Sequence, residues 1–253
     1  MSTLYPHAAT VADFEHNLAA VRGRIAAACR AVGRDPAEVR LLPVSKTVDE
    51  AHIRMAYAAG CRWLGENKVQ EAYVKSQVMA DLADLRWSVI GHLQTNKAKI
   101  VARFASEFQA LDSLRVAEAL DRQLQSLGRA LDVLVQVNSS GEASKYGLPP
   151  DEVPAFVREL PAFSALRVRG LMTLAALSDD ALRVRGCFAL MRGLQQRLRE
   201  DSPDGVEMRE LSMGMSGDYA LAVEEGATIV RVGQAIFGAR ATPDSCSFFS
   251  VTF

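Results

Sequence analysis

A single lysine at the end of an apolar run is the residue best suited to chemistry in this sequence. Residues 39–44 read Val-Arg-Leu-Leu-Pro-Val and are followed by Ser45, Lys46 and Thr47. The short apolar run is typical of a buried β-strand, and Thr47 with Glu50 has the spacing of a helix capping box. A lysine desolvated at such a junction can attack a carbonyl and form a Schiff base. On this stretch alone, a solvent-exposed or salt-bridged Lys46 is the alternative.

Two later segments that are expected to form strands lead into glycine-rich turns. The segment 208–212 continues as Ser-Met-Gly-Met-Ser-Gly over residues 212–217, and the segment 227–232 continues as Gly233-Gln234. Glycines let backbone N–H groups approach an anion closely, and a helix N-terminus behind them favours negative charge. These loops are therefore candidates for a phosphate site, although glycine after a strand can also reflect turn geometry alone.

Short apolar runs alternate with helical patterns along the chain. A first helix is expected over residues 11–32, because apolar residues recur there at spacings of three and four. Further helices are expected over roughly 49–59 and 67–79, from about 95, over roughly 113–128 and from about 150, with Asn67 and Asp112-Ser113 as caps. The expected strands are residues 39–46, 61–64, 85–90, 108–111, 131–137, 166–171, 208–212 and 227–232.

Eight strands, each followed by a helical pattern, predict an α/β fold with a single TIM-type eight-stranded β/α barrel. The length of 253 residues suits this fold, which commonly takes about 250 residues in one domain. We therefore assign residues 1–240 to the barrel. Residues 241–253 form an apolar tail that is too short for a second domain, and its role is open.

The overall composition excludes several classes of protein. The 29 basic and 30 acidic residues nearly cancel, so there is no electrostatic case for binding nucleic acid or an anionic membrane. No apolar run approaches the roughly 18 residues that a membrane span needs, and the N-terminus lacks the pattern of a signal peptide. The four cysteines and four histidines have no metal-ligand spacing. We expect a cytoplasmic protein that binds no metal.

In a β/α barrel, the carboxyl ends of all strands face one common mouth, where the chemistry takes place. The residues expected there are Lys46, Glu66-Asn67, His92, Asp112-Ser113, Asn138, Met172, Ser212 and Arg231. This set offers one amine nucleophile, with an arginine beside the possible phosphate site. A phosphorylated aldehyde would suit both groups. Pyridoxal 5′-phosphate (PLP) is one such ligand, and the substrate of a sugar-phosphate aldolase is the other.

The sequence resembles the pyridoxal-phosphate homeostasis protein family, a single-domain relative of the alanine racemase barrel (fold type III). The resemblance covers about residues 39 to 240, and its motifs are specific when taken together. They are 44–47 (VSKT), 65–71 (GENKVQE), 87–97 (WSVIGHLQTNK), 137–145 (VNSSGEASK), 169–172 (RGLM), 211–218 (LSMGMSGD), 230–233 (VRVG) and 236–238 (IFG). Tyr146 departs from the pattern, because the family more often has a small residue there.

The resemblance implies a cofactor site around Lys46. It implies that Lys46 holds PLP as a Schiff base, that Ser212 and the backbone of Gly233 and Gln234 bind the phosphate, and that Arg231 faces the pyridine nitrogen.

Three further residues are implied near the cofactor with less definite roles. Asn67 is implied near the ring, or is only a helix cap. His92 either stacks on or near the cofactor or has a structural role, and Met172 is expected to pack at the mouth. No catalytic residue is assigned.

The function implied by the resemblance is cofactor homeostasis without significant catalysis. The protein would hold PLP on Lys46 and release it to PLP-dependent apo-enzymes as transient recipients, and we expect a monomer or weak dimer.

A PLP-dependent amino-acid racemase is the alternative, but racemisation needs a base on each face of the α-carbon. The related racemases supply the second base as a tyrosine from another domain, and Tyr146 is the main substitute here. An aldolase that uses Lys46 without cofactor is a weaker hypothesis, because no second lysine or carboxylate is obviously placed to assist Lys46 in the reaction.

Overall fold

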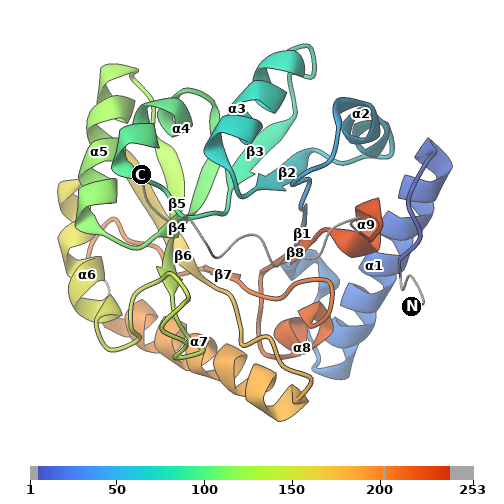
Figure 1. Cartoon of the computed structure of the whole chain (residues 1–253). Coiled ribbons are helices and arrows are strands. Elements are labelled where there is room, and N and C mark those ends of the chain that lie inside the picture. Colours follow the sequence, from blue (N-terminus) through green and yellow to red (C-terminus); the bar gives the residue numbers. More distant parts are fainter. Residues whose placement is uncertain (1–4, 202, 240–253) are drawn as a thin grey trace.

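The computed structural model describes residues 5–201 and 203–239, so the predicted boundary at residue 240 and the apolar tail lie outside the described residues. Eight parallel strands form a single sheet in the order β1-β8-β7-β6-β5-β4-β3-β2. The sheet curls into a nearly closed barrel, and the helices lie around the outside of the strands (Figure 1). The predicted TIM-type barrel is therefore confirmed.

The strands follow the predicted order with shifted boundaries. They are β1 Arg40–Pro43, β2 Trp63–Glu66, β3 Arg86–Val89, β4 Glu107–Leu111, β5 Leu131–Val137, β6 Leu166–Thr173, β7 Glu210–Ser212 and β8 Ile229–Val232. β5 agrees with its prediction at both ends, whereas β2 begins two residues later than expected. The delay arises because Gly60 has a φ of 100° and the Cys61 N–H still bonds to Ala56 O, which makes Cys61 part of the preceding helix end.

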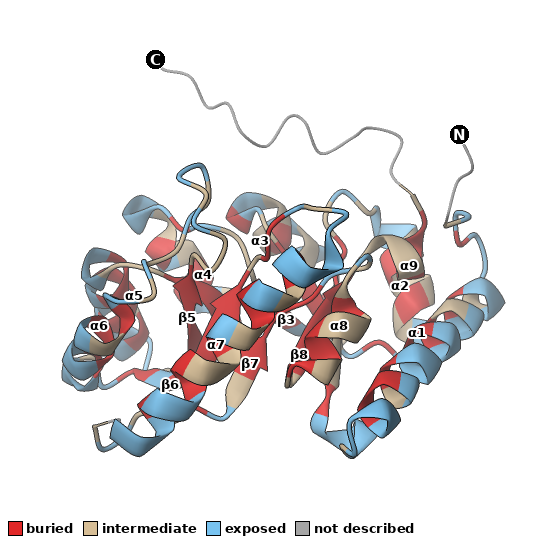
Figure 2. Ribbon diagram, turned by 90° about the horizontal axis from the view of Figure 1, so that it is seen from below, coloured by how far each residue is buried: buried red, intermediate tan, exposed pale blue. Residues whose placement is uncertain are grey.

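The helices pack their apolar faces on the strands and expose their outer faces to solvent (Figure 2). They are α1 Val11–Ala31, α2 Glu50–Ala58, α3 Val69–Val78, α4 Ala98–Phe104, α5 Leu114–Ser126, α6 Val153–Glu159, α7 Ala181–Asp201, α8 Tyr219–Glu224 and α9 Gln234–Phe237. Short 3₁₀ turns cover Pro36–Glu38, Thr95–Lys97 and Leu160–Ala162. The 3₁₀ turn at Thr95 explains why α4 starts later than predicted.

Two predicted helix caps are wrong, and one is confirmed. The N-cap of α2 is Asp49, whose side chain accepts from the His52 N–H, while Thr47 has a φ of 64° and lies in the left-handed region. The N-cap position of α3 is occupied by Lys68 rather than Asn67, because β2 runs on to Glu66. Ser113 caps α5 as expected, with its hydroxyl accepting from the Val116 N–H.

The barrel closes between its first two strands through a short junction. β1 pairs with β8 over four residues, but it meets β2 at one bridge, Val44 with Gly65, and the Ser45 N–H donates to Gly65 O at 3.0 Å. We call this Val44–Gly65 contact the seam. Lys46 follows the seam directly, so the closure of the barrel also places the lysine.

The first and last helices support the mouth beside β8. Phe14 of α1 packs edge-on against Phe237 of α9 with ring centroids 5.5 Å apart, and the Asn17 side chain donates to Ile236 O at 3.0 Å. Phe14 and Leu18 lie four positions apart on the apolar face of α1, and both are fully buried. The short helix α9, which follows Gly233, is thereby fixed against a long one.

The loops after β2 and β3 are packed so closely that only glycine fits at position 91. A Cβ on Gly91 would lie 2.1 Å from Asn67 O. We expect Gly91→Ala to lower the free energy of unfolding by about 2–3 kcal/mol, because one backbone must move. Gly186→Ala on the exposed face of α7, where a Cβ would meet nothing, should instead raise it by about 0.5–1 kcal/mol. Urea-unfolding midpoints measure both changes, and equal midpoints for the two variants would contradict the packing argument.

Candidate functional site

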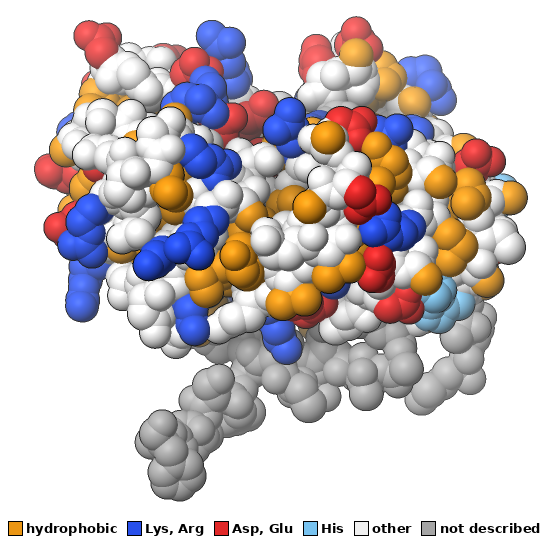
Figure 3. All heavy atoms as spheres, turned by 90° about the horizontal axis from the view of Figure 1, so that it is seen from above, with side chains coloured by type: hydrophobic (Ala, Val, Ile, Leu, Met, Phe, Trp, Pro, Cys, Tyr) orange, Lys and Arg blue, Asp and Glu red, His pale blue; other side chains and the backbone are white. Residues whose placement is uncertain are grey.

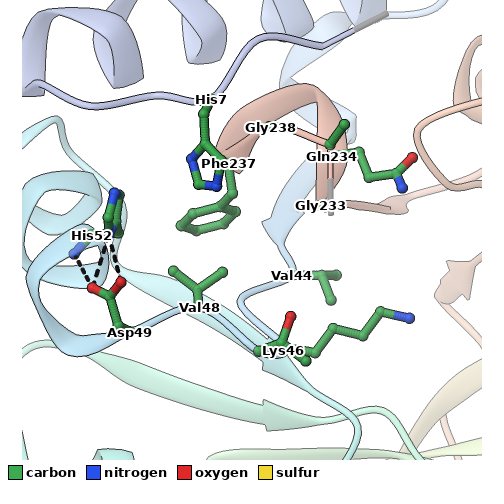
Figure 4. A pocket seen from close by; sticks show the side chains of 12 residues that line it. His7, Val44, Lys46, Val48, Asp49, His52, Gly233, Gln234, Phe237 and Gly238 are labelled. Atoms are coloured by element: carbon green, nitrogen blue, oxygen red, sulfur yellow. Dashed lines mark hydrogen bonds and ion pairs between the residues drawn. The ribbon is translucent and has the colours of Figure 1, made fainter. Parts of the chain in front are cut away.

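Lys46 lines a cavity at the C-terminal mouth of the barrel. The cavity has a volume of about 270 Å³ and lies between the turn after β1 and the turn after β8. Lys46 forms its wall on one side and Gly233-Gln234 on the other, so the structure brings together three of the predicted site residues. Figure 4 shows the half-buried Lys46 side chain extending away from His52 and Asp49.

The residue before Lys46 is fixed by a buried carboxylate and a lysine. The Ser45 hydroxyl donates to Glu66 Oε1 at 2.6 Å, and the Lys75 ammonium donates to both Ser45 O and Glu66 Oε1 at 2.8 Å. Glu66 is fully buried, and Lys75 reaches it from α3 on the outer side of the barrel. The backbone on the N-terminal side of Lys46 is therefore clamped.

The residue after Lys46 is held by a second carboxylate. The Thr47 N–H donates to Glu71 Oε1 at 2.8 Å, and Lys75 also donates to this oxygen at 2.7 Å. This contact stabilises Thr47 in its left-handed conformation, which costs a non-glycine residue about 1–3 kcal/mol. Lys75 thus connects both sides of the turn that presents Lys46.

The two carboxyl groups that share Lys75 have opposite pKa shifts. Burial raises the pKa of Glu66, and its Oε2 has no hydrogen-bond partner among the described residues. Burial also acts to raise the pKa of Glu71, but hydrogen bonds from Lys75 and the Thr47 N–H outweigh it, so that pKa lies below its usual value. Glu66 therefore resists ionisation, while Glu71 is readily ionised.

Arg231 lies inside the barrel at the end of β8. Its guanidinium is buried and donates through Nη1 to the Ser212 hydroxyl and through Nη2 to Thr173 O, both at 2.7 Å. Burial lowers the pKa of Arg231 to about 10, a shift that the nearby Asp218 opposes. The guanidinium is thus a fixed cation at neutral pH. Its predicted role toward the pyridine nitrogen stays a prediction.

The Ser212 hydroxyl is already engaged inside the barrel. It accepts from Arg231 and donates its proton to Gln109 Oε1 at 2.6 Å. Because a hydroxyl has one proton, Ser212 can donate to a phosphate only if the bond to Gln109 is broken. Its predicted role as a phosphate ligand stays a prediction.

The other three predicted site residues occupy different environments. Asn67 is half-buried beside Gly91, and Met172 is fully buried in the core, in register with Ser212. The His92 ring stacks on Tyr146 with centroids 4.0 Å apart and an interplanar angle of 10°. His92 Nδ1 also lies 3.4 Å from Asp112 Oδ2. The roles predicted for Asn67, His92 and Met172 toward a cofactor stay predictions.

Comparison with known proteins places the chain in a family. The family model "Alanine racemase, N-terminal domain" matches residues 12–241. The pyridoxal phosphate homeostasis protein of Pseudomonas aeruginosa is 42% identical over 224 residues, which is 88% of this chain and 94% of the relative. That of Escherichia coli K12 is 40% identical over 237 residues, covering 90% and 97%. The chain belongs to the pyridoxal phosphate homeostasis family of alanine racemase-like barrels.

A solved member of this fold supports the assignment in three dimensions. The structure of PipY from Synechococcus elongatus with PLP bound superposes with a TM-score of 0.79 at 38% identity, covering 89% of this chain and all of that one. The resemblance predicted from the sequence motifs is therefore confirmed, together with the alanine racemase-like fold.

Several residues of this family member that shape the site escaped the sequence analysis. Lys75 and Glu71 stand four positions apart on one helix, which is a recognisable pattern for an ion pair but not for contact with the Lys46 turn. Gln109 is the one polar residue in the predicted strand 108–111, which could have marked it as facing a polar barrel interior. Thr173 lies beyond the predicted end of its strand.

Neither a metal cluster nor a membrane-spanning helix occurs in the part of the chain that the structure describes. Over residues 5–201 and 203–239, no three His, Cys, Asp or Glu side chains are arranged to hold a metal ion. No helix within those ranges is long and apolar enough to cross a membrane. On the face of Figure 3, basic and acidic side chains are both present.

The opposite pKa shifts of Glu66 and Glu71 predict opposite pH dependences of stability. A raised pKa means that Glu66 stabilises the fold below its unfolded pKa and loses this contribution as the pH rises through its folded pKa. The stability of Glu66→Gln relative to wild type should therefore increase as the pH rises above the usual pKa of a glutamate, about 4.3.

Glu71 is the matched control, since its lowered pKa reverses the sign. Its contribution is present above its unfolded pKa and is lost as the pH falls through the folded pKa. Glu71→Gln should be less stable than wild type at neutral pH, by on the order of 1 kcal/mol, and the deficit should shrink in acid. Urea midpoints across the pH range test both variants. Parallel curves for the two would refute the assignment.

Proposed function

We propose that this protein binds PLP as a Schiff base on Lys46 and releases it to PLP-dependent apo-enzymes, without significant amino-acid turnover. The observation that carries the proposal is that Lys46 and the Gly233-Gln234 turn line one cavity. This turn directly follows β8, the strand that contains the buried Arg231. PLP in the PipY structure and the names of the relatives support the same ligand. A cytoplasmic location and a monomer or weak dimer belong to this proposal.

The shape of the site fits a small phosphorylated ring. Its volume of about 270 Å³ is slightly below the range of about 300–1,000 Å³ that is usual for drug-sized ligands. A Cβ on Gly233 would lie 3.2 Å from Val44 O, so a glycine there keeps the backbone close to β1 and open to a phosphate. The basic groups Lys46 and Arg231 complement a ligand that carries negative charge.

PLP supplies an aldehyde, and Lys46 supplies the amine that masks it. The neutral Lys46 amine adds to the aldehyde carbon, and loss of one water molecule leaves a C=N bond. Release is the reverse reaction, in which water adds to the C=N bond and the amine departs from the carbon. The hydrogen bonds on both sides of Lys46 fix the backbone from which its side chain extends into the cavity.

Arg231 supports storage of the cofactor rather than catalysis. A fixed cation beside the pyridine nitrogen would disfavour protonation of that nitrogen. An unprotonated ring is a weak electron sink for carbanion chemistry. The predicted contact of Arg231 with that nitrogen would therefore slow amino-acid turnover while leaving the Schiff base intact.

None of the three tyrosines Tyr73, Tyr146 and Tyr219 lines the cavity that contains Lys46. Tyr146 is 58% exposed and stacks on His92. Tyr219 is buried in α8, and Tyr73 packs against Phe104 on the outer helices. These positions support the carrier function over the racemase alternative.

The first test of the proposal identifies the residue that carries PLP. We expect visible absorption after incubation with PLP, and borohydride reduction followed by peptide mapping should find the pyridoxyl mass on the peptide that contains Lys46. Lys46→Arg keeps the charge but should abolish the reduced adduct, because a guanidinium stays protonated and forms no Schiff base under these conditions. Attachment to Lys75 or Lys145 would contradict the assignment.

A second test separates delivery from catalysis. Wild-type protein loaded with PLP should restore activity to a cofactor-free aminotransferase. The same protein reduced with borohydride is the matched control and should not, since its cofactor cannot be hydrolysed from Lys46. Neither sample should racemise alanine. Robust racemisation that is lost in Lys46→Ala would establish the racemase alternative instead.

A further inference from the structure

A chain of buried polar side chains crosses the interior of the barrel. It starts at Arg231 on β8, passes through Ser212 on β7 and reaches Gln109 and Glu107 on β4. β7 and β4 are not neighbours in the sheet, so the contact between Ser212 and Gln109 spans the barrel. The links are Arg231 Nη1 to Ser212 Oγ (2.7 Å), Ser212 Oγ to Gln109 Oε1 (2.6 Å) and Gln109 Nε2 to Glu107 Oε2 (2.6 Å). All four side chains are buried.

Every hydrogen bond in this chain points the same way. A guanidinium only donates, so the Ser212 oxygen accepts from Arg231 and its proton goes to Gln109 Oε1. The Gln109 amide nitrogen must then face Glu107, whose carboxylate accepts. Gln109 thus has one allowed amide orientation. Together with Ser212, it links the Arg231 guanidinium to the Glu107 carboxylate by hydrogen bonds.

The charges around Arg231 show what this chain of side chains connects. The hydrogen-bonding partners of the buried Arg231 guanidinium are neutral, namely the Ser212 hydroxyl and Thr173 O, and the charge of the nearby Asp218 favours its protonated form. A buried cation is costly unless it is compensated. Glu107 supplies a carboxylate inside the barrel, but Arg40 also holds it at 2.5 Å, so Glu107 cannot leave its place to reach Arg231. Gln109 fills the space between them.

We propose that Gln109 is a positioning residue that orients the Arg231 guanidinium toward the cofactor. This inference rests on the proposed function. Through Ser212, Gln109 holds the guanidinium in one orientation inside the barrel, and Glu107, which Arg40 binds in turn, anchors Gln109. The strength of PLP binding and the absorption spectrum of the bound cofactor then depend on a side chain that does not itself touch PLP.

The test compares Gln109→Leu with a matched buried glutamine. Gln109→Leu should weaken PLP binding roughly tenfold, which corresponds to about 1.4 kcal/mol, and should shift the visible absorption maximum in the same direction as Arg231→Gln. Gln195 is also buried but lies on α7, where its amide donates to Arg209 O at 3.1 Å. Gln195→Leu should lower stability and leave affinity and spectrum unchanged.

A double variant tests whether Gln109 acts through Arg231. In the Arg231→Gln background, Gln109→Leu should change affinity by less than about twofold, because coupled residues are not additive. If Gln109→Leu fails to fold, Gln109→Met removes the same two hydrogen bonds with less change in shape and should shift the spectrum in the same direction. Wild-type affinity and spectrum in whichever variant folds, with only stability reduced, would overturn the inference. Absence of PLP uptake by wild-type protein would overturn the proposed function as well, so the two failures are distinguishable.

Discussion

Closure of the barrel at the seam is the constraint on which the site depends. The strands β1 and β2 meet at the Val44–Gly65 bridge, whereas β1 pairs with β8 over four residues. Lys75 reinforces the seam from outside by binding the backbone of Ser45 and the buried carboxylate of Glu66. A buried ion pair is a poor source of net stability, and the contacts that Lys75 makes with Ser45 O and Glu66 here fix the position of the backbone. That position is the one that aims Lys46 at the mouth.

The two sides of the barrel wall use charge differently. Outside β1 and β2, one lysine shares two carboxylates, and the position of the backbone is the result. Inside the barrel, two arginines share Glu107, one directly and one through Ser212 and Gln109. Arg40 is further stabilised by lying over the Trp63 ring, 4.6 Å from its centroid. Asp218 lies near Arg231 as well, so each of the two arginines has an acidic group close to it.

Local patterns in the sequence were sufficient for the order of elements and for the lysine, but not for the contacts that hold it. The seven residues of β5, of which five are apolar, identified that strand without error, because Gly128 lies shortly before them and a polar loop follows. Thr47 was misassigned as a cap because its spacing to Glu50 is right, while its actual partner, Glu71, lies 24 positions away. The link from Ser212 to Gln109 spans 103 positions. Such pairings depend on the closed barrel and have no local sequence pattern.

The packing of α1 against α9 has a consequence for the time at which the site forms during synthesis. Asn17 and Ile236, which are joined by a hydrogen bond, lie 219 positions apart. Ile236 belongs to α9, the helix that begins right after Gly233. Contacts of such long range are the last to form, since the intervening chain must be complete first. A nascent chain therefore carries Lys46 long before it has the opposite wall of the cavity. Retention of the cofactor is a property of the finished chain, and a ribosome-bound fragment that ends before β8 should be unable to store it.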